Sequence, residues 1–327
     1  MRNPDISVLL PIYQGKETLK ASIESVASQV GDFNLEIVAI DDGSTDGSLE
    51  VLKGHVDKRY IVISQNNQGL AMALNNGLEK ASGRYIARQD QDDLYVAGRL
   101  SAQYEFLERN PDIAMVGTWA HIYRMNEPTS RFHKHPLEPK TIQLELLFNN
   151  PIVHSSVMIR ADVLREVGGY STDRNRQPPE DYELWSRISK KYSIANLPNV
   201  LTIYKEMPGS MSRVAAEDFR NNIIKISSEN LSHYLSPKFT YMDCMQLSTL
   251  MHASENTQAK LKRKKAIEML DIASFKIGGT KADWSREYYL SYSSIKMRIE
   301  YSLGAKGYLR RALGNKLNLL KKYLNKS

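Results

Sequence analysis

Apolar segments of strand length alternate with segments of helical periodicity over residues 6–87. The apolar segments are residues 6–12, 35–40, 60–64 and 84–87, and the segments between them, residues 17–30, 48–54 and 70–81, are predicted to be helices. We expect Pro11 to end the first strand. The alternation predicts an α/β fold with a mostly parallel sheet and helices on both faces. In such folds, ligands bind at the carboxyl ends of the strands.

Three of these strand ends hold distinctive residues. The first strand ends at Pro11 and Tyr13, the second at Asp42, and the fourth at Asp90, Asp92 and Asp93. Turn chemistry accounts for the residues that follow Asp42, whereas Asp42 itself is a candidate ligand contact. No Gly-x-Gly-x-x-Gly follows the first strand and the chain has no Walker loop, which disfavours a dinucleotide dehydrogenase and a phosphate-cradling NTPase.

The acidic cluster Asp90, Asp92 and Asp93 has two interpretations. Crowded carboxylates repel one another, and a hard divalent cation such as Mg²⁺ or Mn²⁺ neutralises them while ligand phosphates complete its shell. Alternatively, the cluster is a solvated acidic loop, which is the commoner case for a run of like charges. The first interpretation predicts a site for a metal ion and a diphosphate.

Composition limits the class of protein. The single cysteine, Cys244, excludes an intramolecular disulfide and a cysteine-rich zinc site, and fits a reducing cytoplasm. No apolar run has membrane length, so we expect a cytoplasmic protein. The net charge of +7 is divided into −4 for residues 1–212 and +11 for residues 213–327. This shift predicts a domain boundary between residues 212 and 213.

A second acidic group, Glu180 and Asp181, begins a segment of helical periodicity. Acidic residues at a helix N-terminus are stabilised by the helix dipole by about 0.3–1 kcal/mol, which explains them without catalysis. His154 lies in a loop that enters a strand and is either a substrate contact or a structural histidine. The spacing of His133 and His135, with no carboxylate or cysteine nearby in the sequence, argues against a metal site there.

Four ordered motifs, ISVLLPIYQG, EIVAIDDGSTDGS, NNQGLAMALNNGLEKASGRYIARQDQDDLY and PEDYELWSRI, resemble those of family 2 glycosyltransferases of the GT-A fold, which act in bacterial polysaccharide assembly. The resemblance covers about residues 5–212, and residues 213–327 are expected to form a mainly helical region. It implies that Tyr13, beside Pro11, stacks on the nucleotide base and that Asp42 accepts a hydrogen bond from the base or ribose. Asp92 would meet ribose and metal, with Asp93 as the direct metal ligand and Asp90 completing the cluster.

The same resemblance implies an inverting reaction, in which Asp181 is the base that takes a proton from an acceptor hydroxyl. Glu180 and His154 would line the pocket for acceptor and sugar. The expected donor is a UDP-sugar, the cofactor Mn²⁺ or Mg²⁺, and the acceptor a saccharide or lipid-linked saccharide. Many relatives carry a histidine that helps to bind the metal or diphosphate at a position where this chain has Met207. Either Lys205 and the loop of residues 209–212 hold the diphosphate instead, or the metal is bound more weakly.

Two other functions are compatible with parts of the pattern. A sugar-1-phosphate nucleotidyltransferase usually has a glycine-rich, basic first loop, which residues 11–16 match poorly. A non-catalytic subunit that binds nucleotide sugars at the membrane would not need both Asp92-Asp93 and Asp181. A measurement of turnover distinguishes this non-catalytic subunit from an enzyme.

The basic tail, residues 301–327, holds seven Lys/Arg, no acidic residue and leucines at helical spacing. Such a helix either packs on the protein's own core or lies in an anionic membrane surface. A lipid-linked acceptor would make the second arrangement useful. Nucleic acid is not an expected partner, since no nucleic-acid-binding module is recognisable.

Deleting residues 301–327 is predicted to release the protein from membranes while sparing sugar-nucleotide binding, because the deletion removes the apolar stripe and its positive charges. Sedimentation with vesicles of anionic lipid measures the first effect and calorimetry the second. An unchanged membrane-bound fraction would contradict the prediction.

Overall fold

The computed structural model describes residues 4–124, 126–206, 216–252 and 261–303. The chain divides into two compact units, Met1–Ile226 and Ser227–Ser327. The boundary predicted between residues 212 and 213 lies outside the described residues.

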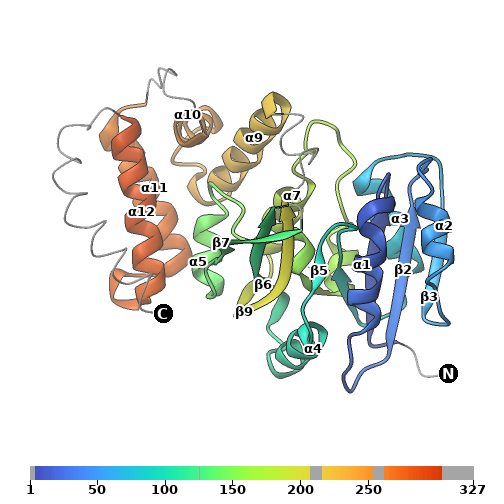
Figure 1. The fold of residues 1–327 in the computed structure, drawn as a ribbon. Helices are drawn as coiled ribbons and strands as arrows, with labels where there is room; N and C mark the ends of the chain where they lie inside the picture. Colours follow the sequence, from blue (N-terminus) through green and yellow to red (C-terminus); the bar gives the residue numbers. More distant parts are fainter. Residues whose placement is uncertain (1–3, 125, 207–215, 253–260, 304–327) are drawn as a thin grey trace. The chain divides into compact units, whose positions relative to one another are not determined.

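Within the described residues, nine strands of the first unit form one sheet in the order β3-β2-β1-β4-β8-β6-β9-β5, with β7 paired to β6 (Figure 1). The strands are β1 (Ile6–Ile12), β2 (Leu35–Asp41), β3 (Tyr60–Ser64), β4 (Tyr85–Arg88), β5 (Leu94–Tyr95), β6 (Ile113–Arg124), β7 (Glu127–His133), β8 (Met158–Arg160) and β9 (Ser193–Glu206). Strands β1 to β4 are mutually parallel, and β8 joins them antiparallel. The predicted α/β fold is confirmed.

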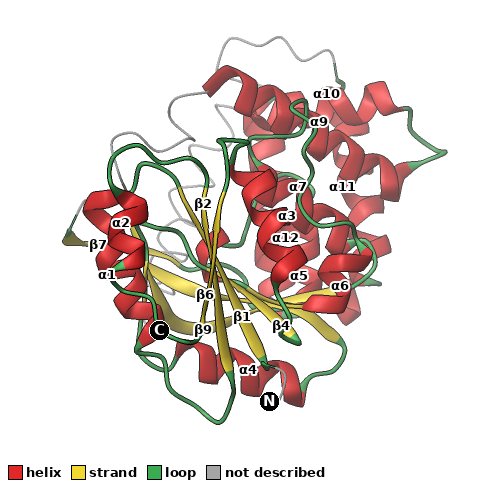
Figure 2. Cartoon of the chain, turned by 90° about the vertical axis from the view of Figure 1, so that its right-hand side faces the viewer, coloured by secondary structure: helices red, strands yellow, loops and turns green. Residues whose placement is uncertain are grey.

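Helices cover both faces of this sheet (Figure 2). They are α1 (Lys16–Ala27), α2 (Ser48–Lys53), α3 (Leu70–Lys80), α4 (Arg99–Arg109), α5 (Pro139–Glu145), α6 (Ala161–Glu166) and α7 (Glu180–Ser189), with a 3-10 turn, η1 (His154–Ser156), between α5 and β8. Successive residues of a strand point to opposite faces. Leu9 of β1 accordingly packs with residues of α3, α6 and α7, and Val8 with residues of α1 and α4.

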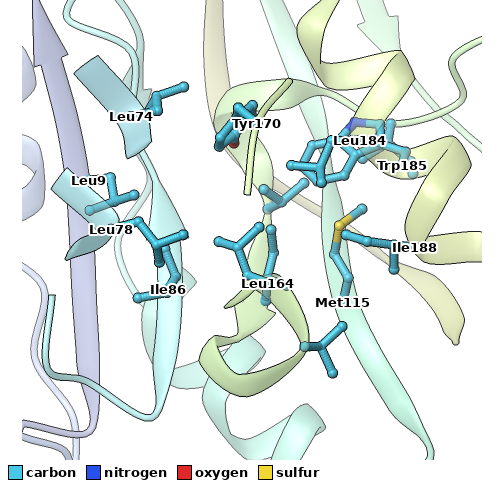
Figure 3. Close-up of a cluster of buried hydrophobic side chains, with 14 of the residues drawn as sticks. Leu9, Leu74, Leu78, Ile86, Met115, Leu164, Tyr170, Leu184, Trp185 and Ile188 are labelled. Carbon is cyan, nitrogen blue, oxygen red and sulfur yellow. The ribbon is translucent and has the colours of Figure 1, made fainter. Parts of the chain in front are cut away.

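The larger core joins the two ends of the sheet. Leu9, Leu74, Leu78 and Ile86 come from the first strands and α3, and Met115, Leu164, Tyr170, Leu184, Trp185 and Ile188 from the later elements (Figure 3). Trp185 and Leu184 are fully buried in α7, as the helical periodicity after Asp181 predicts. Because each buried side chain of this size contributes about 1.5–3 kcal/mol, this core fixes α7 against the sheet.

The expectation that Pro11 ends the first strand is wrong, because β1 continues to Ile12. Pro11 pairs in register with Ile40 of β2, whereas the pairing of β1 with β4 ends at Leu9 and Arg88. In a parallel strand the N–H and C=O of one residue face the same neighbour, and Leu9 O accepts from Gln89 N on the β4 side. Pro11 faces that side too, where no ladder hydrogen bond requires its missing N–H.

The described part of the second unit is helical, as predicted. Helix α9 (Ala216–Leu235) contains the boundary, and α10 (Tyr241–His252), α11 (Arg263–Gly278), a 3-10 turn η2 (Lys281–Asp283) and α12 (Arg286–Ser302) follow. Helices α11 and α12 pair through the Tyr288 hydroxyl, which donates to Ser274 O at 2.8 Å, and through the Arg263–Glu300 ion pair at 2.9 Å. Residues 304–327, with the predicted leucine stripe, lie outside the described part. Among the helices described, none combines the length and the apolar character needed to cross a bilayer.

Candidate active site

The acidic loop, residues 89–93, directly follows β4 and is held by hydrogen bonds from neighbouring elements. Gln89 N donates to Leu9 O at 3.0 Å, which extends the pairing of β1 and β4 by one residue. The Gln89 side chain donates to Asp93 O at 2.6 Å and to Ser22 Oγ of α1 at 2.8 Å. Ser22 Oγ in turn donates to Asp90 O at 2.9 Å. The carboxylates therefore project from a fixed backbone.

The three carboxylates of this loop have different surroundings. Burial opposes ionisation of Asp90, but the guanidinium of Arg88, 2.6 Å away, outweighs it and lowers the pKa of Asp90. Burial and the negative charge of Asp90 raise the pKa of Asp92 to about 6. Asp92 is partly exposed, and among the described residues no other residue donates a hydrogen bond to its carboxylate. Its oxygens are available to a ligand.

Asp93 is the most enclosed of the three. It is 1% exposed, and burial together with Asp90 and Asp92 raises its pKa well above the usual range. One carboxylate oxygen accepts from Lys205 N of β9 at 2.8 Å, and the other accepts from the Ser155 hydroxyl of η1. Asp93 thus ties the acidic loop to two segments that lie far away in the sequence.

Two buried arginines, neither of which was predicted from the sequence to be a site residue, lie beside the acidic loop. Arg88 is 2% exposed and Arg99 of α4 is fully buried. Arg99 donates to Arg88 O at 3.2 Å, and its guanidinium lies 3.7 Å from the centre of the Tyr95 ring. The sequence does hold a signal for Arg88, because an arginine ends the apolar strand Tyr85–Arg88 directly before the acidic cluster.

Tyr13 and Asp42 lie at the carboxyl ends of the neighbouring strands β1 and β2, where Pro11 is also placed. The Tyr13 side chain is 48% exposed, so its ring is open to a ligand. Asp42 is 4% exposed, and its carboxylate accepts 2.8 Å hydrogen bonds from Gln65 Nε2, Gln68 N and Gly69 N. Asp42 therefore holds the loop before α3, and most of its hydrogen-bonding capacity is used within the protein.

Glu180 and Asp181 form the first turn of α7. Asp181 is partly exposed and accepts from Asn150 Nδ2 at 2.7 Å and from Tyr182 N at 2.7 Å. Burial raises the pKa of Asp181 to about 6, although both hydrogen bonds favour its charged form. Burial and the charge of Asp181 raise the pKa of Glu180 to about 7. A carboxylate with a pKa near 6 is ionised at neutral pH and can still accept a proton.

Segment η1 joins the acidic loop to α7. His154 Nε2 lies 3.0 Å from the Tyr170 hydroxyl, and His154 Nδ1 lies 3.7 Å from Glu180 Oε1. Burial and the charge of Arg88 lower the pKa of His154 to about 3, so the imidazole is neutral at pH 7. Since Ser155 binds Asp93, successive residues of η1 contact the two acidic groups. The charge of Asp90 accordingly affects the pKa of both Glu180 and Asp181.

The end of β9 lies beside the acidic loop as well. Burial and the charges of all three aspartates raise the pKa of Tyr204. Lys205 Nζ donates to Asn126 Oδ1 at 3.2 Å, and its charge offsets a small part of the rise in the pKa of Asp92. Met207 lies outside the described residues. The ring of His133 packs against Tyr204, with centroids 5.2 Å apart, and stacks on His135 at 5.5 Å.

The donor set fits a cation that is shared with a ligand. Among the residues that the structure describes, no three His, Cys, Asp or Glu side chains gather as a ready-made metal site. Asp92 nevertheless presents free oxygens whose ionisation is opposed by burial and by Asp90, a situation that a divalent cation relieves. Mg²⁺ and Mn²⁺ commonly bind through one or two carboxylates and complete their shell with substrate phosphates.

Comparisons with known proteins identify the family. The model of the family described as glycosyl transferase family 2 matches residues 7–168. An uncharacterized glycosyltransferase of Haemophilus influenzae is 33% identical over 246 residues, which cover 71% of this chain and 75% of the relative. The Escherichia coli UDP-Glc:alpha-D-GlcNAc-diphosphoundecaprenol beta-1,3-glucosyltransferase WfaP is 28% identical, with 72% of this chain and 92% of WfaP covered.

Two solved structures share the fold. S. aureus TarS 1-349 in complex with UDP-GlcNAc has a TM-score of 0.59 at 17% identity, covering 91% of this chain and 92% of that one. The mannosyltransferase PcManGT from Pyrobaculum calidifontis, in complex with GDP-Man and Mn²⁺, has a TM-score of 0.53 at 15% identity, with coverage of 93% and 87%. The first unit therefore has the GT-A fold.

Replacing Glu180 by Gln is predicted to stabilise the protein more at pH 8 than at pH 5. The folded state holds the Glu180 proton up to about pH 7, and the unfolded state releases it near the ordinary value of 4.5. Folded protein therefore binds more protons between these values, and its stability falls as the pH rises. Thermal unfolding should show a gain of a few degrees at pH 8 and a smaller gain at pH 5.

Glu79→Gln, which removes one exposed charge from α3, is the control for the change in net charge. An equal effect of Glu180→Gln at both pH values would contradict the raised pKa.

Proposed function

The chain belongs to glycosyl transferase family 2, and from this premise we propose that it is an inverting enzyme that transfers a sugar from a nucleoside diphosphate to a hydroxyl group. The proposed donor is a UDP-sugar, and the proposed acceptor is a saccharide or lipid-linked saccharide in the synthesis of a cell-surface polysaccharide. One observation carries the proposal: η1 brings the acidic loop and the Glu180–Asp181 pair to the same site. Binding of the donor diphosphate through a cation needs one acidic group, and removal of the proton from the acceptor hydroxyl needs another.

The nucleoside is assigned to the ends of β1 and β2. The exposed ring of Tyr13 is available to stack on a base, which contributes about 1–3 kcal/mol for any base. Asp42 keeps little free hydrogen-bonding capacity, so we assign it at most one contact to the base or ribose. A preference for uracil is supported by relatives: the name of WfaP gives UDP-Glc as its donor, and TarS was solved with UDP-GlcNAc.

We assign the cation to Asp92 and the diphosphate of the donor. A bound Mn²⁺ or Mg²⁺ neutralises the charge that develops on the departing diphosphate. Asp92 has free oxygens, whereas those of Asp93 are engaged by Lys205 N and Ser155. Asp93 then orients the loop, and Asp90, paired with Arg88, keeps its charge beside Asp92. The ammonium group of Lys205 is the candidate cationic contact to the diphosphate.

Asp181 is assigned as the base. Inversion requires a base on the face of the sugar opposite the leaving group, within about 2.6–3.2 Å of the attacking hydroxyl. Asn150 and Tyr182 N hold the Asp181 carboxylate in place and leave it partly exposed. Glu180 is assigned to the acceptor pocket. His154, which is neutral and bound to Tyr170, lies 3.7 Å from Glu180 and does not take part in proton transfer at neutral pH.

The acceptor is proposed by analogy. WfaP carries GlcNAc-diphosphoundecaprenol in its name, so its acceptor is linked to a lipid. A lipid-linked acceptor in this protein would place the enzyme at the cytoplasmic face of a membrane. Lys262 and Lys264, exposed at the start of α11, favour an anionic surface there, whereas Arg263 and Lys265 pair with Glu300 and Asp243.

Mn²⁺ is predicted to strengthen the binding of UDP, and to do so through Asp92. Calorimetry of the full-length protein with UDP, GDP, CDP and ADP, with and without Mn²⁺, measures both the base and the metal dependence. In Asp92→Asn the benefit of Mn²⁺ should disappear, because the carboxylate with free oxygens is gone. Asp93→Asn should retain it, since an amide can still accept from Lys205 N and face Ser155. The reverse result would make Asp93 the metal ligand, and no binding of any diphosphate would refute the donor site.

Asp181→Asn is predicted to lower transfer by at least about 100-fold, the usual contribution of a general base. Binding of UDP should change by less than about twofold, because Asp181 belongs to the acceptor side. In the wild type, kcat should fall on acidification below about pH 6, since protonation of Asp181 removes the base. UDP release with GlcNAc-diphosphoundecaprenol as the first acceptor measures these effects. Asp173→Asn, an exposed residue before α7, is the matched control, and normal turnover of Asp181→Asn would exclude its role.

A further inference from the structure

Gln91, which stands between Asp90 and Asp92 in the acidic loop, pairs with the backbone of Tyr13. Its Oε1 accepts from Tyr13 N at 2.8 Å, and its Nε2 donates to Tyr13 O at 2.9 Å. One side-chain amide therefore satisfies both backbone groups of one residue, as a neighbouring strand would. No other residue of the acidic loop makes such a contact to Tyr13 among the described residues.

This contact continues the pairing of β1 with β4 after the ladder has ended. Leu9 and Tyr13 face the same side of β1, and the ladder on that side ends at Leu9 and Arg88. Gln91 replaces the missing strand with its side chain. As a result, the backbone that carries the exposed Tyr13 ring is attached to the loop that carries Asp92.

Gly15 leaves the space that this contact needs. A Cβ at position 15 would lie 2.3 Å from Gln91 Oε1 and 2.5 Å from Gln91 Cδ, too close for the observed position of the amide. The backbone of Gly15, at φ −112° and ψ 12°, is in a region that other residues also adopt. Space for Gln91, and not backbone conformation, is therefore what requires glycine here.

The other side of the same segment is held separately. Gln14 N donates to Ser44 Oγ at 3.2 Å, Gly15 N to Ser48 Oγ at 2.9 Å and Lys16 N to Asp46 Oδ2 at 3.0 Å. These bonds attach residues 14–16 to the loop after β2 and to the start of α2. Loss of Gln91 would thus free Tyr13 from the acidic loop without detaching the whole segment, so the fold should persist.

We propose that Gln91 is a positioning residue for the donor nucleotide: it fixes the distance between the Tyr13 ring and Asp92, which hold the base and the diphosphate of one molecule, and Gly15 makes room for it. The inference rests on the proposed function. A rigid link between the two subsites lets a nucleoside diphosphate bind both without first ordering the protein, and such preorganisation raises affinity.

The test measures the affinity of UDP in the presence of Mn²⁺ for the full-length protein and its variants. Gln91→Ala should weaken UDP binding about tenfold, as expected for the loss of two modest hydrogen bonds that order the site. Gln91→Asn, whose side chain is one methylene shorter, should behave like Gln91→Ala. The KM for the donor should rise to the same extent, while kcat and the unfolding temperature stay near those of the wild type.

Gly15→Ala should weaken UDP binding as Gln91→Ala does, because the new Cβ displaces the amide. The double variant should be no worse than either single variant, since the same contact is lost in each case. Gly54→Ala, where a Cβ would meet its nearest neighbour at an ordinary 3.5 Å, is the matched glycine control.

Wild-type affinity for UDP in Gln91→Ala overturns the inference, and so do additive effects in the double variant. These results differ from failure of the proposed function, in which the wild-type protein itself does not bind UDP and the inference falls with it.

Discussion

The structure of the site depends on the way in which buried negative charge is balanced. Asp90, Asp92 and Asp93 crowd one loop, and a fully buried Arg88 is bound to only one of them. Arg88 lowers the pKa of Asp90, whereas burial and the neighbouring charges raise those of Asp92 and Asp93. Arg88 therefore supplies only part of the positive charge that would balance the three carboxylates. A bound cationic ligand would have to supply the rest.

Hydrogen bonds and packing around the acidic loop keep its three carboxyl groups close together. The loop keeps its carboxyl groups close together because Ser22 of α1 binds its backbone, Ser155 of η1 binds Asp93, and Gln89 donates to Asp93 O within the loop. The core cluster that contains Leu9 and Trp185 includes residues of β4 and of the segments beside η1, and α1 packs through Val26 in a second cluster. The fold thus holds Asp92 and Asp93 where their ionisation is opposed and where a cationic ligand would favour it.

The sequence predicts the first half of this molecule well and the contacts within the site poorly. Strands β1 and β4 are buried along their whole length and β2 along most of it, so their apolar runs predict strands, and the position of the acidic residues at the strand ends follows from the topology. The end of the first strand was predicted wrongly because β4 pairs with β1 only as far as Leu9, which leaves Pro11 without a ladder partner on that side, and no local pattern reveals this. The roles of Arg88, Gln91 and Ser155 arise from contacts between distant segments. Family resemblance points to the aspartates but not to the residues that orient them.

Ser155 and Lys205 follow Asp93 by 62 and 112 residues, and both meet its carboxylate. Three separate stretches of the chain therefore converge on a single side chain. This has a consequence for chimeric enzymes. A donor-binding half taken from one homologue and an acceptor-binding half from another would join across these contacts, and a mismatch at any of the three stretches would leave a buried carboxylate without its partner. Exchange of acceptor specificity should therefore succeed through surface loops that spare these three positions, and not through exchange of whole halves.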